Sequence, residues 1–203
     1  LLQNREYSLH DRLVNVLSAS AEIQYALDEE DTEEIKAIAQ KLSHPEIIAE
    51  RVESLKKALP EKPLENAENM LLYLERLDFI GDILPQQIKD ASRFVKKLSA
   101  PLKAQTSGEY EKLAVYFVYR YFLKAVRDFD LLSKIKAMIV FVFAAEVINL
   151  SREQDAHARF ETVKELCKEI EYSGDNMDRI YDDSYLSDIF SDTSMLALLE
   201  WTL

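Results

Sequence analysis

The residues best suited to chemistry lie in the second half of the 203-residue sequence. Arg120 stands between Tyr119 and Tyr121 in an aromatic helical segment, where a cation must be paired or must reach water. Its planar guanidinium could anchor a carboxylate or phosphate of a ligand. The alternative is a buried ion pair that fixes helix register, and the sequence favours this structural role. The candidate partners are Glu146, Glu169 and Glu171.

Glu169, Glu171 and Cys167 share one predicted helix. The two glutamates are separated by two positions, so they project from different sides and cannot act as a paired acid and base. Cys167 is the only cysteine, which excludes an intrachain disulfide and a four-thiolate metal or cluster site. Its apolar-periodic surroundings favour a buried thiol over a nucleophile, and such cysteine usage indicates a reducing compartment such as the cytoplasm.

His157 lies four residues from both Glu153 and Glu161, so the three side chains would share one helix face. A carboxylate-bridged metal centre needs a second, matching helix, and the sequence has none. We therefore expect a solvated polar face and no metal site. Glycine-rich phosphate loops and nucleophile elbows are also missing from the sequence, although a cofactor pocket between helices remains compatible with it.

Composition indicates the elements that would position these residues. Three glycines and five prolines provide too little turn chemistry for a many-stranded β fold, and good helix formers dominate. The formal net charge of −12 argues against binding to nucleic acid or to an anionic membrane. It is compatible with a basic partner, such as a lysine-rich protein segment, although solubility alone explains it more simply.

Apolar periodicity and capping residues predict an all-α, multi-helix globular bundle. Ser8 and Pro45 mark the starts of the first and third helices, and either Asp31 or Thr32 caps the second. Pro60 and Pro63 break the chain. The later helices are expected over 64–77, 82–98, 109–127, 131–150 (after an Asp130 cap) and 151–172 (opened by Ser151 and stopped by Gly174), followed by a short acidic helix and a tail. The helices over 109–127 and 131–150 should form a buried central pair, because aromatic residues point to nearly all sides of the first and a long apolar run forms the centre of the second. A tight turn over 128–130 joins them, so they should pack antiparallel.

The length fits a single helical domain over 1–203, with 1–59 and 64–203 as candidate subdomains. The sequence opens Leu1-Leu2-Gln3 without a methionine or a signal pattern, which is typical of a piece of a longer protein.

Three segments resemble the flagellin lysine-N-methylase family. The run from Tyr116 to Val126 (YFVYRYFLKAV) is similar to the family's Y-x-V-Y-R-F-F helix, and an apolar helix follows in both. The run from Cys167 to Asn176 (CKEIEYSGDN) resembles the segment R-E-I-E-H-S-x-x-N, with Lys168 in place of arginine and Tyr172 in place of histidine. Near the start, YSLHDRL resembles the family's S-L-x-x-R-L helix.

The resemblance implies a protein that transfers methyl groups from S-adenosylmethionine to lysines of flagellin. The family's cysteine-rich part, with its iron–sulfur cluster, precedes the matched region, so no cofactor is expected in this chain itself. The matched motifs single out Tyr119, Arg120, Glu169, Glu171 and Asn176 as motif-supporting or substrate-side residues. The alternative function is a non-catalytic, all-helical protein-interaction module.

Overall fold

A computed structural model describes residues 1–42, 44–57, 62–102, 108–152 and 155–201. These residues form helices and turns without a β-strand, so the all-α prediction is confirmed. The α-helices are α1 (Leu9–Asp28), α2 (Thr32–Lys41), α3 (Pro45–Lys57), α4 (Pro63–Leu74), α5 (Ile83–Val95), α6 (Gly108–Tyr121), α7 (Ala125–Asp128), α8 (Leu132–Arg152), α9 (Ala156–Leu166), α10 (Gly174–Leu186) and α11 (Asp192–Leu199). No helix of the described ranges is both long and apolar enough to cross a membrane.

The first three helices begin at the predicted residues. The Ser8 side chain caps α1, and the Asp31 side chain caps α2 by accepting two backbone N–H groups. Pro45 is the first residue of α3, where its missing N–H costs nothing. Pro60 lies outside the described residues, whereas Pro63 begins α4.

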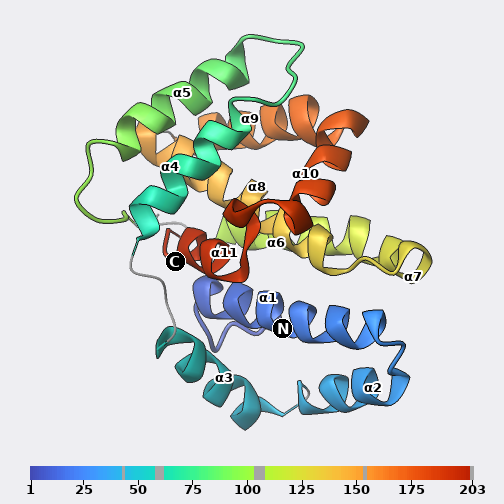
Figure 1. The fold of residues 1–203 in the computed structure, drawn as a ribbon. Helices are drawn as coiled ribbons and strands as arrows, with labels where there is room; N and C mark the ends of the chain where they lie inside the picture. The colour runs from blue at the N-terminus through green and yellow to red at the C-terminus, as the bar shows by residue number, and fades with distance from the viewer. Residues whose placement is uncertain (43, 58–61, 103–107, 153–154, 202–203) are drawn as a thin grey trace.

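Helix α8 forms the centre of the bundle. Every residue from Leu132 to Asn149 is buried, and the helix contacts α1, α5, α6, α9, α10 and α11 (Figure 1). The Asn149 side chain, near the end of α8, donates to the Tyr110 hydroxyl at the start of α6, at 3.1 Å. The rings of Phe117 and Phe141 meet between them, with centroids 4.5 Å apart. Helices α6 and α8 therefore run in opposite directions.

Helix α6 is shorter and more exposed than the sequence predicts. It ends at Tyr121, and a 3₁₀ turn and the short α7 complete the predicted range. The side chains of Tyr119, Phe122 and Leu123 are exposed. The expectation of burial on all sides is therefore wrong for this helix, because only one of its faces packs against the core.

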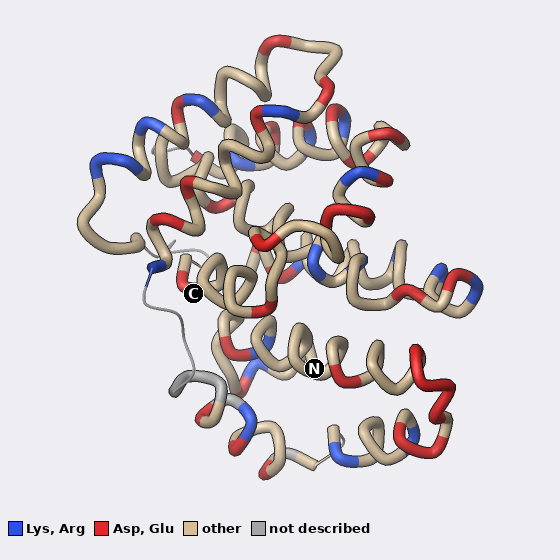
Figure 2. The backbone as a smooth tube through the Cα atoms, in the orientation of Figure 1, with Lys and Arg blue, Asp and Glu red and all other residues tan. Residues whose placement is uncertain are grey.

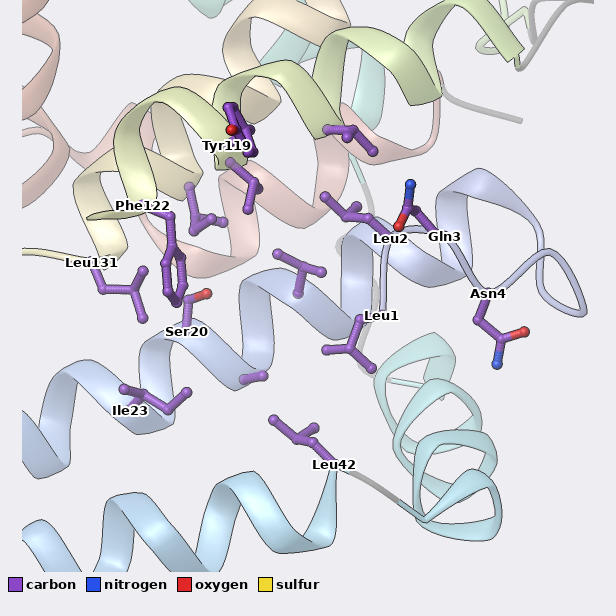
Figure 3. A pocket seen from close by; sticks show the side chains of 15 residues that line it. Leu1, Leu2, Gln3, Asn4, Ser20, Ile23, Leu42, Tyr119, Phe122 and Leu131 are labelled. Atoms are coloured by element: carbon purple, nitrogen blue, oxygen red, sulfur yellow. The ribbon is translucent and has the colours of Figure 1, made fainter. Parts of the chain in front are cut away.

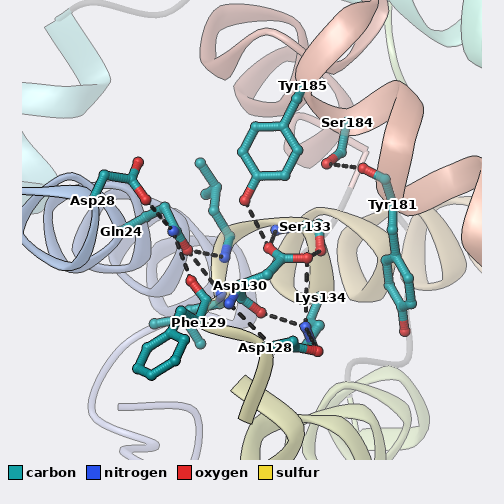
Figure 4. Close-up of polar contacts among 12 residues, drawn as sticks. Gln24, Asp28, Asp128, Phe129, Asp130, Ser133, Lys134, Tyr181, Ser184 and Tyr185 are labelled. Carbon is teal, nitrogen blue, oxygen red and sulfur yellow. Dashed lines mark hydrogen bonds and ion pairs between the residues drawn. The ribbon is translucent and has the colours of Figure 1, made fainter. Parts of the chain in front are cut away.

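The Gln24 side chain connects the end of α1 to the start of α8 (Figure 4). Its Oε1 accepts the backbone N–H groups of Leu131, at 2.8 Å, and Leu132, at 3.2 Å. Its Nε2 donates to the Phe129 carbonyl at 2.9 Å, and Phe129 adopts a left-handed backbone with φ of 56°. One buried amide thus satisfies donors that the start of α8 would otherwise leave unpaired.

Asp130 caps α8, as the sequence predicts. It accepts the Ser133 backbone N–H at 3.2 Å and the Tyr185 hydroxyl at 2.7 Å (Figure 4). The buried ammonium of Lys134 pairs with Asp128 at 2.9 Å and lies 3.5 Å from Asp130. These contacts join the start of α8 to α10 and explain how a lysine is tolerated in a buried helix.

Glu146 is the exception among the charged residues of α8. It is fully buried, and neither carboxylate oxygen has a hydrogen-bond partner among the described residues. Burial raises the pKa of this carboxyl well above its ordinary value of 4.5. The neutral, protonated acid is therefore the form that the core accommodates.

Two predicted boundaries around α9 are wrong. Ser151 does not open a helix, because α8 continues to Arg152 and the Ser151 hydroxyl donates to a carbonyl within it. Asp155 caps α9 instead, by accepting the Ala158 N–H at 2.9 Å. Gly174 does not end a helix but begins α10, after Ser173 as its cap.

Buried apolar residues of α1, α4, α5, α6, α8, α9, α10 and α11 belong to one hydrophobic core, to which the fully buried Trp201 contributes. The division into 1–59 and 64–203 stays a prediction. Acidic residues occur along many of the helices, with the dense run Asp28–Asp31 at the turn between α1 and α2 (Figure 2).

Candidate functional site

The candidate site is built around a π-helical turn, Cys167–Glu171, that continues α9. A π-helical turn is wider than an α-helical one and often occurs at functional sites. The side chains of Glu169 and Glu171 project from this turn in different directions, as their spacing predicts. Glu171 contacts α6, whereas Glu169 contacts the loop that follows α4.

Glu171 is completely buried and is held by two tyrosine hydroxyls. Tyr116 donates to its Oε1 at 2.6 Å, and Tyr121 donates to the same oxygen at 2.8 Å. The Arg120 Nε lies 3.0 Å from this oxygen and 3.2 Å from the Tyr121 hydroxyl. The second oxygen, Oε2, is buried without a hydrogen-bond partner among the described residues. A buried carboxylate with one satisfied oxygen is a strong acceptor for a further donor.

Three tyrosine rings surround the Arg120 guanidinium. Its Cζ atom lies 5.9 Å from the ring centroid of Tyr116, 5.6 Å from that of Tyr121 and 5.4 Å from that of Tyr172. These distances fall within the range of cation–π attraction. We call Tyr116, Tyr121 and Tyr172, with Glu171 at their base, the tyrosine cage. Arg120 occupies it with 43% of its side chain exposed, so the cage opens to solvent.

Burial and the neighbouring Glu171 keep the cage hydroxyls protonated. Burial, reinforced by Glu171, raises the pKa of Tyr121 to about 12 and also raises that of Tyr116. The hydrogen bond to Tyr121 contributes most to the raised pKa of Arg120. Burial, together with the neighbouring Glu171, raises the pKa of the Cys167 thiol as well. The cage is therefore suited to hold a cation, not to act as a base or a nucleophile.

Glu169 and Asn176 fix the loop beside the cage. Glu169 accepts the backbone N–H groups of Ile80, at 2.7 Å, and Gly81, at 3.2 Å, and pairs with Lys168 at 2.9 Å. The Asn176 amide accepts the Asp78 N–H at 3.0 Å and donates to the carbonyls of Asp78 and Glu169, at 2.7 and 3.0 Å. Both side chains thus connect the loop after α4 to the π-helical turn.

A family model described as the FliB lysine N-methylase C-terminal domain matches residues 1–198. The chain belongs to this family. Comparisons with curated proteins and with solved structures give no match. The family membership confirms the resemblance drawn from the aromatic helix and from the Cys167–Asn176 segment.

In this FliB C-terminal domain, four of the five residues singled out by the motifs lie around the π-helical turn. Arg120 and Glu171 meet in the tyrosine cage, and Glu169 and Asn176 hold the adjoining loop. Glu171 is therefore the partner of Arg120. Of the other two candidates, Glu169 pairs with Lys168, and Glu146 has no hydrogen-bond partner among the described residues. The pair with Glu171 neutralises much of the guanidinium charge and weakens its attraction for a second anion.

Tyr119 is the fifth residue, and it lies away from the cage. It is 85% exposed and lines the mouth of an apolar pocket of about 480 Å³ between α1, the end of α2 and α6 (Figure 3). The pocket walls include Val16, Ile23, Phe122 and Leu131. Its volume is in the range of small-molecule sites, but the structure gives it only a few polar groups to orient a ligand.

Sequence reasoning missed Tyr116 and Tyr172 as site residues of the FliB domain. Tyr116 stands four positions before Arg120, and this spacing places both side chains on one helix face, so helical periodicity contained the signal. Tyr172 was noted only because it replaces an expected histidine. It directly follows the π-helical turn, and its ring centroid lies 5.4 Å from the Arg120 Cζ atom.

Among the described residues, no group of three or more His, Cys, Asp or Glu side chains is arranged to hold a metal ion. Glu153, one of the three residues on the His157 face, lies outside the described residues. An iron–sulfur cluster needs several cysteine thiolates, and the sequence supplies only Cys167.

Proposed function

We propose that this chain is the helical C-terminal part of an S-adenosylmethionine-dependent protein-lysine N-methyltransferase that acts on flagellin. The observation that carries the proposal is the family match over residues 1–198. In this proposal, a cysteine-rich part outside the sequence holds the iron–sulfur cluster and the methyl donor. The helical part then serves the substrate side and is not catalytic alone.

The charge of the domain supports a role on the substrate side. A net charge of −12 attracts lysine-rich segments and speeds their encounter with the domain. The cage hydroxyls stay protonated, and the chain's only thiol has a raised pKa, so neither provides a nucleophile or a base for methyl transfer. In this proposal, the groups that transfer the methyl group therefore lie outside the helical domain.

Mass spectrometry of flagellin tests the proposal. The methyltransferase, carrying this domain together with its cysteine-rich part, is incubated with flagellin and S-adenosylmethionine under reducing, cluster-reconstituted conditions. We expect mass increases on flagellin lysines that correspond to added methyl groups. Unmodified lysines under these conditions would overturn the assignment.

Ionic strength provides a second test. If the acidic surface attracts a lysine-rich segment, added salt slows the association of flagellin with the domain, because screening weakens long-range attraction. The measured quantity is the association rate constant at several salt concentrations. A rate constant that does not respond to salt contradicts the electrostatic role.

A further inference from the structure

We propose that the tyrosine cage is a docking site for the ammonium group of a substrate lysine, in which Arg120 is an exchangeable occupant. The identity of the protein that brings the lysine rests on the proposed function. The cage would bind the lysine and would not methylate it.

The carboxylate at the base of the cage is positioned without help from Arg120. The hydroxyls of Tyr116 and Tyr121 fix its Oε1 from two directions, and the side chain has no exposed surface. Departure of Arg120 would therefore leave a preformed, buried negative charge that requires a cation. Its Oε2, unpartnered among the described residues, offers a second acceptor. An ammonium group has three donors and can use both oxygens.

The rings of the cage suit a compact cation. Tyr116 and Tyr121 come from α6, while Tyr172 approaches from the end of the π-helical turn. Tyr172 is 66% exposed and forms the outer wall. Aromatic faces attract ammonium groups and retain this attraction when the nitrogen is methylated. The same cage can thus hold a lysine before and after methylation.

Arg120 is positioned to leave. The hydrogen bond and the ion pair of its guanidinium both involve Nε, and its Nη atoms bond no other described residue. Its partly exposed side chain has a path to solvent. The ammonium of Lys124 lies 4.7 Å from the centroid of the Tyr121 ring, so the cage already holds positive charge. An incoming lysine must therefore displace the guanidinium and cannot simply join it.

The experiment uses butylammonium, which has the ammonium and four-carbon stem of a lysine side chain. Its binding to the 203-residue chain is measured by NMR titration of the tyrosine rings. Arg120→Ala should bind it more tightly than the wild type by about tenfold or more, because the resident competitor is gone. The double variant Arg120→Ala/Glu171→Gln should not show this increase in affinity for butylammonium. Arg93→Ala, which removes an exposed arginine paired with Asp90, should match the wild type.

Equal affinity in the wild type and Arg120→Ala, or a gain that survives Glu171→Gln, would overturn the proposal. If Arg120→Ala does not fold, the wild type is compared with Tyr172→Ala, which alters only the exposed wall. Butylammonium should then shift the ring signals of Tyr116 and Tyr121, and the variant should bind it more weakly. A lack of shifts, or unchanged affinity in the variant, would refute the site.

The outcomes separate this inference from the proposed function. Flagellin methylation without butylammonium binding would leave the methyltransferase assignment intact and refute the docking site. Binding at the cage without flagellin methylation would establish an ammonium site and refute the assignment to flagellin. Butylacetamide, which carries no charge, serves as the ligand control and should not bind to any variant.

Discussion

Glu146 allows a quantitative test of how the core of the bundle handles an ionisable group. Its carboxyl is buried in α8 without a hydrogen-bond partner among the described residues, and burial raises its pKa. Glu146→Gln keeps the shape and removes the titration, whereas Glu146→Leu also removes the polar atoms. Both variants should gain stability relative to the wild type as the pH rises.

The sign follows from the direction of the pKa shift. A raised folded-state pKa means that the folded protein binds the proton more tightly than the unfolded chain. The stabilisation is complete below the ordinary pKa of 4.5 and is lost as the pH rises toward the folded-state value. Within this window, each pH unit lowers the unfolding free energy of the wild type by about 1.4 kcal/mol relative to Glu146→Gln. At neutral pH, the unfolding free energy of Glu146→Leu should exceed that of the wild type by about 2 kcal/mol or more.

Urea unfolding, followed by far-ultraviolet circular dichroism at several pH values, measures these differences. Glu50→Gln removes an exposed glutamate of α3 and controls for the change in net charge. The reasoning would be refuted if the wild type and Glu146→Gln lost stability in parallel between about pH 5 and about pH 6. It would also be refuted if Glu50→Gln reproduced the effect.

Two further predictions concern the surroundings of the cage. In Gly81→Ala, the added Cβ would lie 3.0 Å from the Glu169 carboxylate, which must shift away from the N–H groups it accepts. Thermal unfolding should show a loss of about 1–2 kcal/mol, whereas Gly174→Ala, with no atom within 4 Å of its Cβ, is the matched control. In Glu171→Gln, the lost charge should lower the pKa of the Cys167 thiol. The pH–rate profile of its alkylation should then move to lower pH, and an unmoved profile would contradict this electrostatic coupling.

The sequence predicted the features that depend on local pattern. The apolar run of α8 indicated its burial, and Ser8, Pro45 and Asp130 marked helix starts correctly. For the second helix, the structure selects Asp31 over Thr32 as the cap. These predictions succeeded because a cap or an apolar stripe is contained within a few neighbouring residues.

Features that depend on packing could not be predicted in the same way. Arg120 had three candidate partners, and only the arrangement of α6 against the π-helical turn selects Glu171. The turn itself has no recognisable sequence signal, since it differs from an α-helix by one added residue in the ring of its hydrogen bonds. At Ser151, a local capping pattern competed with continued burial of α8, and tertiary packing prevailed.

The position of Cys167 has a practical consequence. It is the only cysteine of the sequence, and it lies in the same π-helical turn as Glu171, whose charge affects its thiol. Any thiol-directed label on the 203-residue chain therefore attaches beside the tyrosine cage. We expect a cation that replaces Arg120 beside Glu171 to change the reactivity of this thiol, so the unmutated 203-residue chain provides its own probe for the proposed docking site.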